Sequence, residues 1–146
     1  MTRPQTVLAF DFGLKRIGIA GGDTLTRQAA ARAAAAVRGG IPDWQAIARE
    51  VRALTPAVLI VGAPYNADGS EGKLLARARR FAAELERRFA LPVQLVDERF
   101  SSLEAHQALK ARRASGRRGR IERADIDSAA AAVILGRWFQ GEGKGT

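Results

Sequence analysis

Three acidic residues stand at places in the sequence where a carboxylate could bind a metal ion. Asp11 ends one apolar run, Glu98 ends another, and Asp127 falls where we expect the first turn of the last helix. The dipole of a helix favours a carboxylate near its N-terminus. Converging carboxylates bind Mg²⁺, and two such ions about 4 Å apart can activate water and stabilise the leaving oxygen of a phosphodiester. The acids therefore predict metal-dependent cleavage of nucleic acid.

Each acid also has a purely structural explanation. Asp11 could simply start a turn, and Glu98 could pair with Arg99 at the rim of a sheet. Asp127 could be an ordinary charge near the start of a helix, and Asp125 is its rival for any role in catalysis. These explanations are less convincing for the three acids together than for each one alone, because an acid that follows an apolar strand is expected at the carboxyl edge of the sheet. Open α/β folds place their sites at that edge.

Basic residues exceed acidic ones, which points to a polyanionic partner. The 146 residues include 24 Lys and Arg against 15 Asp and Glu, a formal net charge of +9. Six arginines fall within twelve positions: Arg112, Arg113, Arg117, Arg118, Arg120 and Arg123. A charged loop could be merely solvated, but arginines so close together repel one another without an anion. We therefore expect this segment, and Arg117, Arg118 and Arg120 in particular, to contact nucleic-acid phosphates.

Four further residues are candidates for binding the substrate. Lys15 and Arg16 lie in a predicted hairpin turn near the first acid, where they could grip a phosphate or form only a solvated tip. Asn66 belongs to a polar loop, 65–72, that could contact substrate or be explained by an Asp-Gly turn and a helix cap. Arg99 points away from its acidic neighbour on a strand and could bind the substrate backbone or hold the sheet edge.

Alternating strands and helices must position these residues. Apolar runs predict strands, and helical spacing of apolar residues predicts helices, one of them capped by Asp43. The predicted strands are 6–11, 17–20, 57–62 and 92–98, and the predicted helices are 43–54, about 72–90, 101–113 and about 125–139. The alanine-rich segment 27–38 has the local propensity of a helix. This order predicts a single α/β domain over residues 1–140 with a mixed sheet, followed by a flexible tail, 141–146.

Composition excludes several classes of site. With no cysteine the chain has no disulfide, zinc–thiolate site or thiol nucleophile, and it suits a reducing cytoplasm. The N-terminal apolar run is short and meets an acid at once, so we expect neither a signal peptide nor a membrane anchor. No apolar run reaches the roughly 18 residues of a spanning helix, and we expect no membrane partner.

Four sequence blocks, taken together, resemble one known family. They are DFGLKRIGIA (11–20), VGAPYNADGSEG (61–72), VDERFSSLEA (96–105) and IDSAAAAVIL (126–135). In this order they are similar to the successive motifs of the YqgF/RuvX family. Its members are small bacterial RNase H-like proteins, called Holliday junction resolvases or precursor ribosomal RNA nucleases. Any one block is weak, but four in order, spanning nearly the whole chain, are specific.

The resemblance implies a ribonuclease H-like fold, an α/β fold with a five-stranded mixed sheet whose first three strands are antiparallel. It also implies that Asp11, Glu98 and Asp127 are catalytic and hold Mg²⁺ or Mn²⁺. The fold requires a strand within 30–38, so we expect a strand there against the local propensity. The expected substrate is the 5′ end of precursor 16S ribosomal RNA. A junction resolvase and a non-catalytic nucleic-acid-binding protein remain alternatives, and the protein could be a monomer or a homodimer.

Overall fold

The protein is built on a six-stranded mixed sheet. The computed structural model describes residues 4–63, 72–97 and 123–141. The strands are β1 (Thr6–Phe12), β2 (Arg16–Asp23), β3 (Ala29–Arg38), β4 (Ile41–Pro42), β5 (Val58–Ala63) and β6 (Val93–Asp97), and the helices are α1 (Trp44–Leu54), α2 (Lys73–Phe89) and α4 (Arg123–Gln140). The order across the sheet is β4-β3-β2-β1-β5-β6. Strands β1, β2 and β3 pair antiparallel, as predicted, while β5 and β6 run parallel to β1, so the carboxyl ends of β1, β5 and β6 share one edge.

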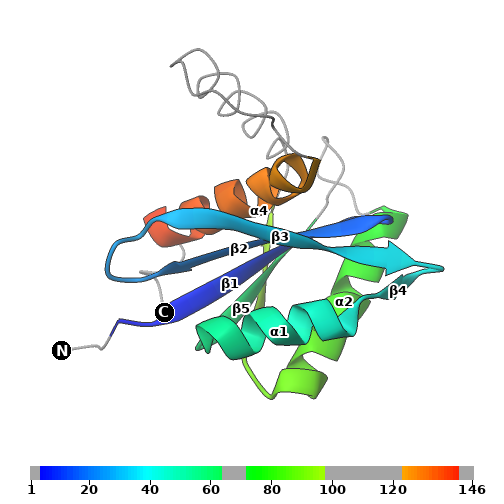
Figure 1. Ribbon diagram of the computed structural model, residues 1–146, viewed down its shortest axis with the longest axis horizontal. Coiled ribbons are helices and arrows are strands. Elements are labelled where there is room, and N and C mark those ends of the chain that lie inside the picture. Colours follow the sequence, from blue (N-terminus) through cyan, green and yellow to red (C-terminus); the bar gives the residue numbers. More distant parts are fainter. Residues whose placement is uncertain (1–3, 64–71, 98–122, 142–146) are drawn as a thin grey trace, which may run out of the picture.

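Helices cover both faces of this sheet. Helix α4 packs on one face, and α1 and α2 pack on the other (Figure 1). Successive side chains of a strand point to opposite faces. In β1 this alternation sends Val7 and Ala9 towards α4, whereas Leu8 and Phe10 point towards α1 and α2. Both faces of β1 are therefore buried, which explains why its sequence reads as a continuous apolar run.

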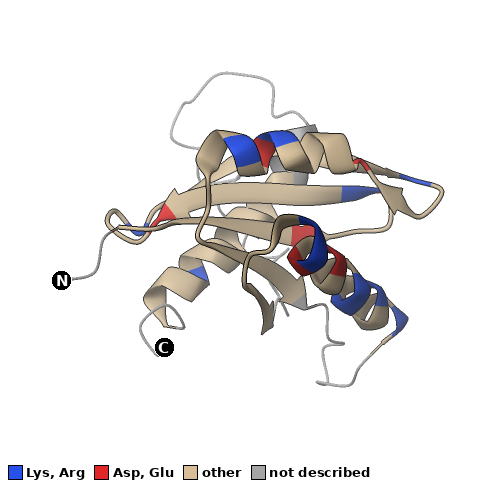
Figure 2. Ribbon diagram, turned by 90° about the horizontal axis from the view of Figure 1, so that it is seen from below, with Lys and Arg blue, Asp and Glu red and all other residues tan. Residues whose placement is uncertain are grey.

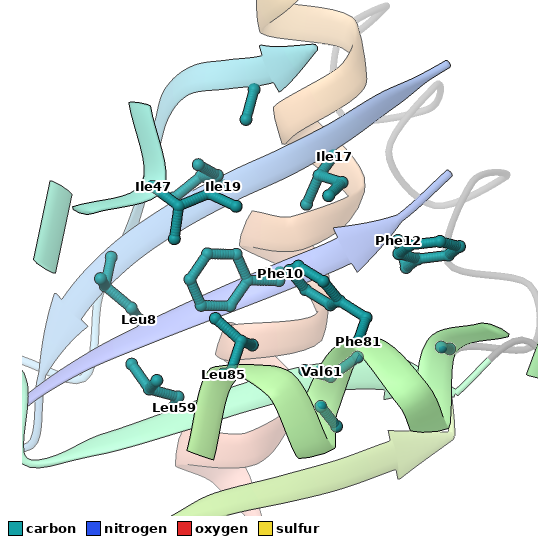
Figure 3. Packing of buried hydrophobic residues seen from close by; sticks show 13 residues of the cluster. Leu8, Phe10, Phe12, Ile17, Ile19, Ile47, Leu59, Val61, Phe81 and Leu85 are labelled. Carbon is teal, nitrogen blue, oxygen red and sulfur yellow. The ribbon is translucent and has the colours of Figure 1, made fainter. Parts of the chain in front are cut away.

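Aromatic rings from β1 and α2 form the centre of the core beneath α1 and α2. Phe10 meets Phe81 edge to face, with ring centroids 5.7 Å apart and planes at 76°, and Phe12 packs on the same ring at 5.4 Å. Leu85 and Ile47 close around them (Figure 3). Edge-to-face pairs add to the gain from apolar burial, so these contacts fix α2 against the carboxyl half of β1.

The alanine-rich segment is a strand, β3, which confirms the expectation from the resemblance over local propensity. It pairs with β2 along most of its length, and Arg32 ties it to α1 through a 2.6 Å hydrogen bond from Nε to Glu50 Oε1. Small alanine side chains let α4 approach the sheet closely at this place. The conformation of this segment is therefore decided by its pairing with β2 and its packing against α4, and neither of these contacts is local in sequence.

The prediction of five strands was wrong, because β4 adds a short sixth strand at the edge. Val37 pairs with Pro42 and Arg38 with Ile41, across a turn of Gly39 and Gly40. The two glycines have φ of +57° and +78°, which side-chain-bearing residues adopt rarely. A two-residue turn with positive φ at both positions is the usual connection of a tight hairpin.

The remaining described elements match their predicted ranges to within two or three residues. The Asp43 carboxylate caps α1 by accepting a 3.1 Å hydrogen bond from the Ala46 amide, as predicted. The predicted helix 101–113 lies outside the described residues. Within the described ranges, no helix combines the length and the apolar character that crossing a membrane requires.

Candidate active site

Asp11 lies at the edge of the sheet where the parallel strands end. We expected it to end its strand, but β1 continues to Phe12, so Asp11 is the last residue but one. It follows Val7 and Ala9 in the alternation and therefore lies on the face that α4 covers. The residue is half-buried. A half-buried carboxylate on a rigid strand is suited to holding a cation, because it is positioned without being cut off from solvent.

Both strand neighbours of Asp11 at its level are glycines. In β2 its partner is Gly18. In β5 the pairing of Phe10 with Val61 places the next residue, Gly62, beside it. At the level of Asp11, therefore, neither neighbouring strand carries a side chain. A hydrated divalent cation and a phosphate oxygen need such space, since Mg²⁺ keeps several of its waters when proteins bind it.

Strand β6 leads towards the second predicted acid along the same face. Gln94 accepts a 3.0 Å hydrogen bond from the Trp138 indole of α4, and Val96 packs in the cluster beneath that helix. Glu98 itself lies outside the described residues, so its place in the site stays a prediction. The same holds for the predicted substrate contacts Asn66, Arg99, Arg117, Arg118 and Arg120.

Helix α4 begins earlier than the sequence suggested. It starts at Arg123, so Asp125 falls in its first turn and Asp127 in the second. The prediction that Asp127 lies in the first turn was wrong, and the dipole argument applies to Asp125 instead, because the effect fades beyond the first turn. The side chains of residues 123–127 are not among those described. The assignment of Asp127 thus rests on its place in the motif.

A buried serine fixes this part of α4 to the sheet. Ser128 is the one fully buried polar side chain of the described residues, and its Oγ accepts a 3.1 Å hydrogen bond from the backbone amide of Ile19. Ile19 follows Gly18, the strand partner of Asp11, and Ser128 follows Asp127. This hydrogen bond therefore joins the residue after Asp127 to β2, the strand that pairs with Asp11. Sequence reasoning missed Ser128, although a lone serine before an alanine-rich apolar helix face was a visible signal.

The hairpin between β1 and β2 places two basic residues at the same edge. A Cβ at Gly13 would lie 2.5 Å from the carbonyl oxygen of Arg16, so this tight hairpin requires glycine. The Lys15 carbonyl accepts a 2.8 Å hydrogen bond from the Val37 amide, which ties the hairpin to β3. Lys15 is exposed, whereas Arg16 begins β2 and is half-buried. The prediction that Lys15 lies near Asp11 is confirmed for the backbone, because the β1–β2 hairpin holds both residues.

The donor chemistry of the predicted ligands fits a hard divalent cation. Three carboxylates supply oxygen ligands only, which Mg²⁺ and Mn²⁺ prefer. Of these ligands only the Asp11 side chain is described, and within the described residues no three potential ligands gather. Nucleases of this kind of fold generally use divalent metal ions.

Comparison with known proteins gives a consistent result. A family profile described as "RuvX: Holliday junction resolvase" matches residues 5–141. A protein of Edwardsiella ictaluri (strain 93-146) named "Putative pre-16S rRNA nuclease" is 42% identical over 139 residues, which cover 95% of this chain and 97% of that one. A protein of the same name from Legionella pneumophila is 45% identical over 133 residues, covering 91% and 94%.

Solved structures share the fold at low sequence identity. The RuvC protein of T. thermophilus, solved in complex with a Holliday junction substrate, aligns with a TM-score of 0.59 at 15% identity, covering 95% of this chain and 96% of RuvC. The yeast mitochondrial Holliday junction resolvase Ydc2 aligns with a TM-score of 0.51 at 11% identity, covering 92% and 77%. These likenesses confirm the ribonuclease H-like fold.

Proposed function

Because this chain belongs to the RuvX family of Holliday junction resolvases, we propose that it is a metal-dependent endonuclease that processes the 5′ end of precursor 16S ribosomal RNA. The observation that carries the proposal is the setting of Asp11. It is a half-buried carboxylate at the carboxyl edge of the parallel strands, with glycine on both sides and α4 held beside it by Ser128. Such an edge is where α/β folds place their reactive groups.

Three carboxylates would hold the metal. Asp11, Glu98 and Asp127 together would bind Mg²⁺ or Mn²⁺, and the bound ions would activate water and neutralise charge at the cleaved phosphodiester. Asp11 contributes a ligand on a strand buried on both faces, so its position changes little when the metal binds. Lys15 is exposed at the same edge and would neutralise a neighbouring phosphate of the substrate.

Basic side chains on other elements would supply affinity for the polyanion. Helix α2 carries six basic residues against two acidic ones, which are coloured along the helix in Figure 2, and all six basic side chains are exposed. The arginine-rich segment around Arg117, Arg118 and Arg120 would add phosphate contacts, and Asn66 and Arg99 would lie nearer the cleaved bond. Contacts of this kind position the substrate without reading its sequence.

Ribosomal RNA is the favoured substrate, because relatives that are more than 40% identical over nearly their whole length are named "Putative pre-16S rRNA nuclease". Branched DNA is the second candidate, favoured by the family description and by the RuvC fold. The two make different demands on assembly. Symmetric cutting of a four-way junction calls for a two-fold dimer, whereas a single cut in RNA is within reach of a monomer. Processing of precursor RNA would take place in the cytoplasm.

The decisive experiment compares both substrates with one variant. We expect the wild-type protein to cleave precursor 16S RNA with Mn²⁺ or Mg²⁺ and to be inactive with a chelator. Asp11→Asn should abolish cleavage and leave binding largely intact, because the amide keeps the size of the side chain but loses its charge. Undiminished cleavage by the variant would overturn the assignment. Binding without cleavage by the wild type would favour a non-catalytic role, and preferential cutting of junction DNA would favour the resolvase.

A further inference from the structure

A groove of about 450 Å³ opens beside the candidate active site, on the other face of the sheet. Its walls come from the ends of β1 and β3, the β4 hairpin, the start of α1 and the middle of α2. It begins at Phe12, the residue after Asp11, whose side chain points to α1 and α2. Among the described residues, the groove and the Asp11 carboxylate therefore lie on opposite faces of the same end of β1. Its volume lies in the range of small-ligand sites.

The mouth of the groove is apolar and exposed. Leu14 is 57% exposed and Ile41 is 67% exposed, and they are two of the four large apolar side chains exposed on the described parts of the chain. Behind them the Trp44 ring contacts Phe81, with ring centroids 5.5 Å apart and planes at 27°, and the Arg88 guanidinium, which lies 4.2 Å from the Trp44 centroid. Apolar side chains gathered at the rim of a concave surface commonly mark a binding site. The occupant should thus have an apolar part that packs against Leu14 and Ile41.

The wall formed by α2 is positively charged. Arg77 and Arg80 are three residues apart on one side of the helix, and neither is in an ion pair with any described residue. Glu84 also lines the groove, but Arg87 and Arg88 hold its carboxylate, with the Arg88 bond at 2.8 Å. The groove therefore carries an excess of positive charge.

A nucleotide combines an apolar part, its base, with a negative charge, its phosphate. Unpaired nucleotides bind proteins by laying the base on apolar or aromatic side chains and the phosphate on arginine. We infer that this groove binds one unpaired nucleotide of the substrate strand next to the cleaved phosphodiester. The inference rests on the proposed function, since that function brings nucleic acid to Asp11. It extends that function by specifying that the substrate has a single-stranded flank beside the cut.

Binding measurements on an inactive protein test the groove separately from cleavage. In the Asp11→Asn background, fluorescence anisotropy would compare an RNA hairpin with and without a short single-stranded flank. Ile41→Ser should weaken binding of the flanked hairpin about three- to tenfold and leave binding of the blunt hairpin unchanged. Arg80→Gln should weaken binding of the flanked hairpin by a similar factor, and by clearly more than it weakens binding of the blunt hairpin. Leu25→Ser and Arg52→Gln are matched controls, because Leu25 is 74% exposed against 67% for Ile41 and Arg52 has the same charge as Arg80, yet both lie outside the groove.

A flank with abasic sugars separates base contact from phosphate contact. We expect the Asp11→Asn protein to bind the hairpin with the abasic flank weakly. Its affinity should be as low as that of the Asp11→Asn, Ile41→Ser protein for the hairpin with the intact flank. Equal affinity for intact and abasic flanks would overturn the inference, as would equal losses in the control variants. Displacement of the flank by an acidic peptide of matched charge, with no preference for RNA, would show a protein-binding groove instead. None of these outcomes depends on cleavage, so failure of the proposed function would be recognised separately.

Discussion

The hydroxyl of Ser128 accepts a hydrogen bond from the backbone amide of Ile19 at 3.1 Å, across the interface between α4 and β2. The pairing of β2 with β3 shifts register beside this amide, between Ile17 and Ile19. The serine thus provides an acceptor at the point where the ladder is irregular. Since it adjoins Asp127 in the chain, the bond also sets how α4 approaches the strand paired with Asp11.

We predict that Ser128→Ala lowers both stability and metal affinity. A buried amide without an acceptor costs about 1–3 kcal/mol, so the free energy of unfolding in urea should fall by about that amount. The Mn²⁺ concentration for half-maximal cleavage should rise, because the backbone before Ser128 loses its anchor. Thr24→Ala is the matched control, since Thr24 Oγ1 accepts a 2.9 Å bond from the Gln5 amide at an exposed place. An equal change in metal dependence in both variants would contradict the positioning role.

The fold was predictable from the sequence to the extent that its elements are decided locally. The apolar run of β5 and the amphipathic helix α2 have clear patterns, and both were predicted nearly to their ends. Strand β3 was not decided locally, because alanine favours helix, and only the family motifs indicated a strand. The edge strand β4 was missed, although Gly39 and Gly40 between Arg38 and Ile41 had the composition of a hairpin turn.

Single residues of the candidate site could be predicted from the sequence, but their contacts with other strands and helices could not. Asp11 stood out because an acid follows an apolar run. The contribution of Gly18 and Gly62 needed strand register, which sequence spacing alone does not supply. The bond from Ile19 to Ser128 joins residues 109 positions apart in the chain, and no local pattern predicts such a partner.

Two glycine-to-alanine substitutions should have opposite effects. A Cβ at Gly13 would lie 2.5 Å from the Arg16 carbonyl oxygen, and this backbone atom cannot move far because the hairpin is tight. Gly13→Ala should therefore lower the free energy of unfolding by about 1–3 kcal/mol and reduce cleavage. Gly136 lies within α4, and a Cβ there would have no neighbouring atom within 4 Å, so Gly136→Ala should raise stability by about 0.5–1 kcal/mol. Urea denaturation measures both, and a stable, fully active Gly13→Ala protein would contradict the requirement.

Acid should weaken α2 through Glu84. Hydrogen bonds from Arg87 and then Arg88 lower the pKa of the Glu84 carboxyl to about 2 from its usual 4.5. Because the folded-state pKa is lowered, the stabilisation is fully present above pH 4.5 and is lost as the pH falls towards 2. Melting temperatures between pH 5 and pH 2 should therefore fall less steeply for Glu84→Gln than for the wild type. The effect should be small and reduced by salt, since the groups are exposed.

Glu86→Gln is the control for this pH effect. Glu86 lies in the same part of α2 but is in no ion pair with the described residues. Its removal should leave the slope of melting temperature against pH close to that of the wild type. If Glu84→Gln and Glu86→Gln changed the slope equally, the effect would come from net charge and not from the two arginine contacts.

Metal binding should be measurable without any substrate. A ligand that binds only the folded state stabilises it by about 2.7 kcal/mol at a hundredfold excess over its Kd, so Mn²⁺ should raise the melting temperature of the wild type. Asp11→Asn should remove most of that rise, because a neutral amide is a poorer ligand for a hard cation. Asp23→Asn is the matched control: its carboxylate lies at the opposite end of the β1–β2 pair from Asp11 and already accepts bonds from the Leu25 and Thr26 amides. A rise that persists in Asp11→Asn but disappears in Asp23→Asn would place the metal at the wrong end of the sheet and overturn the site.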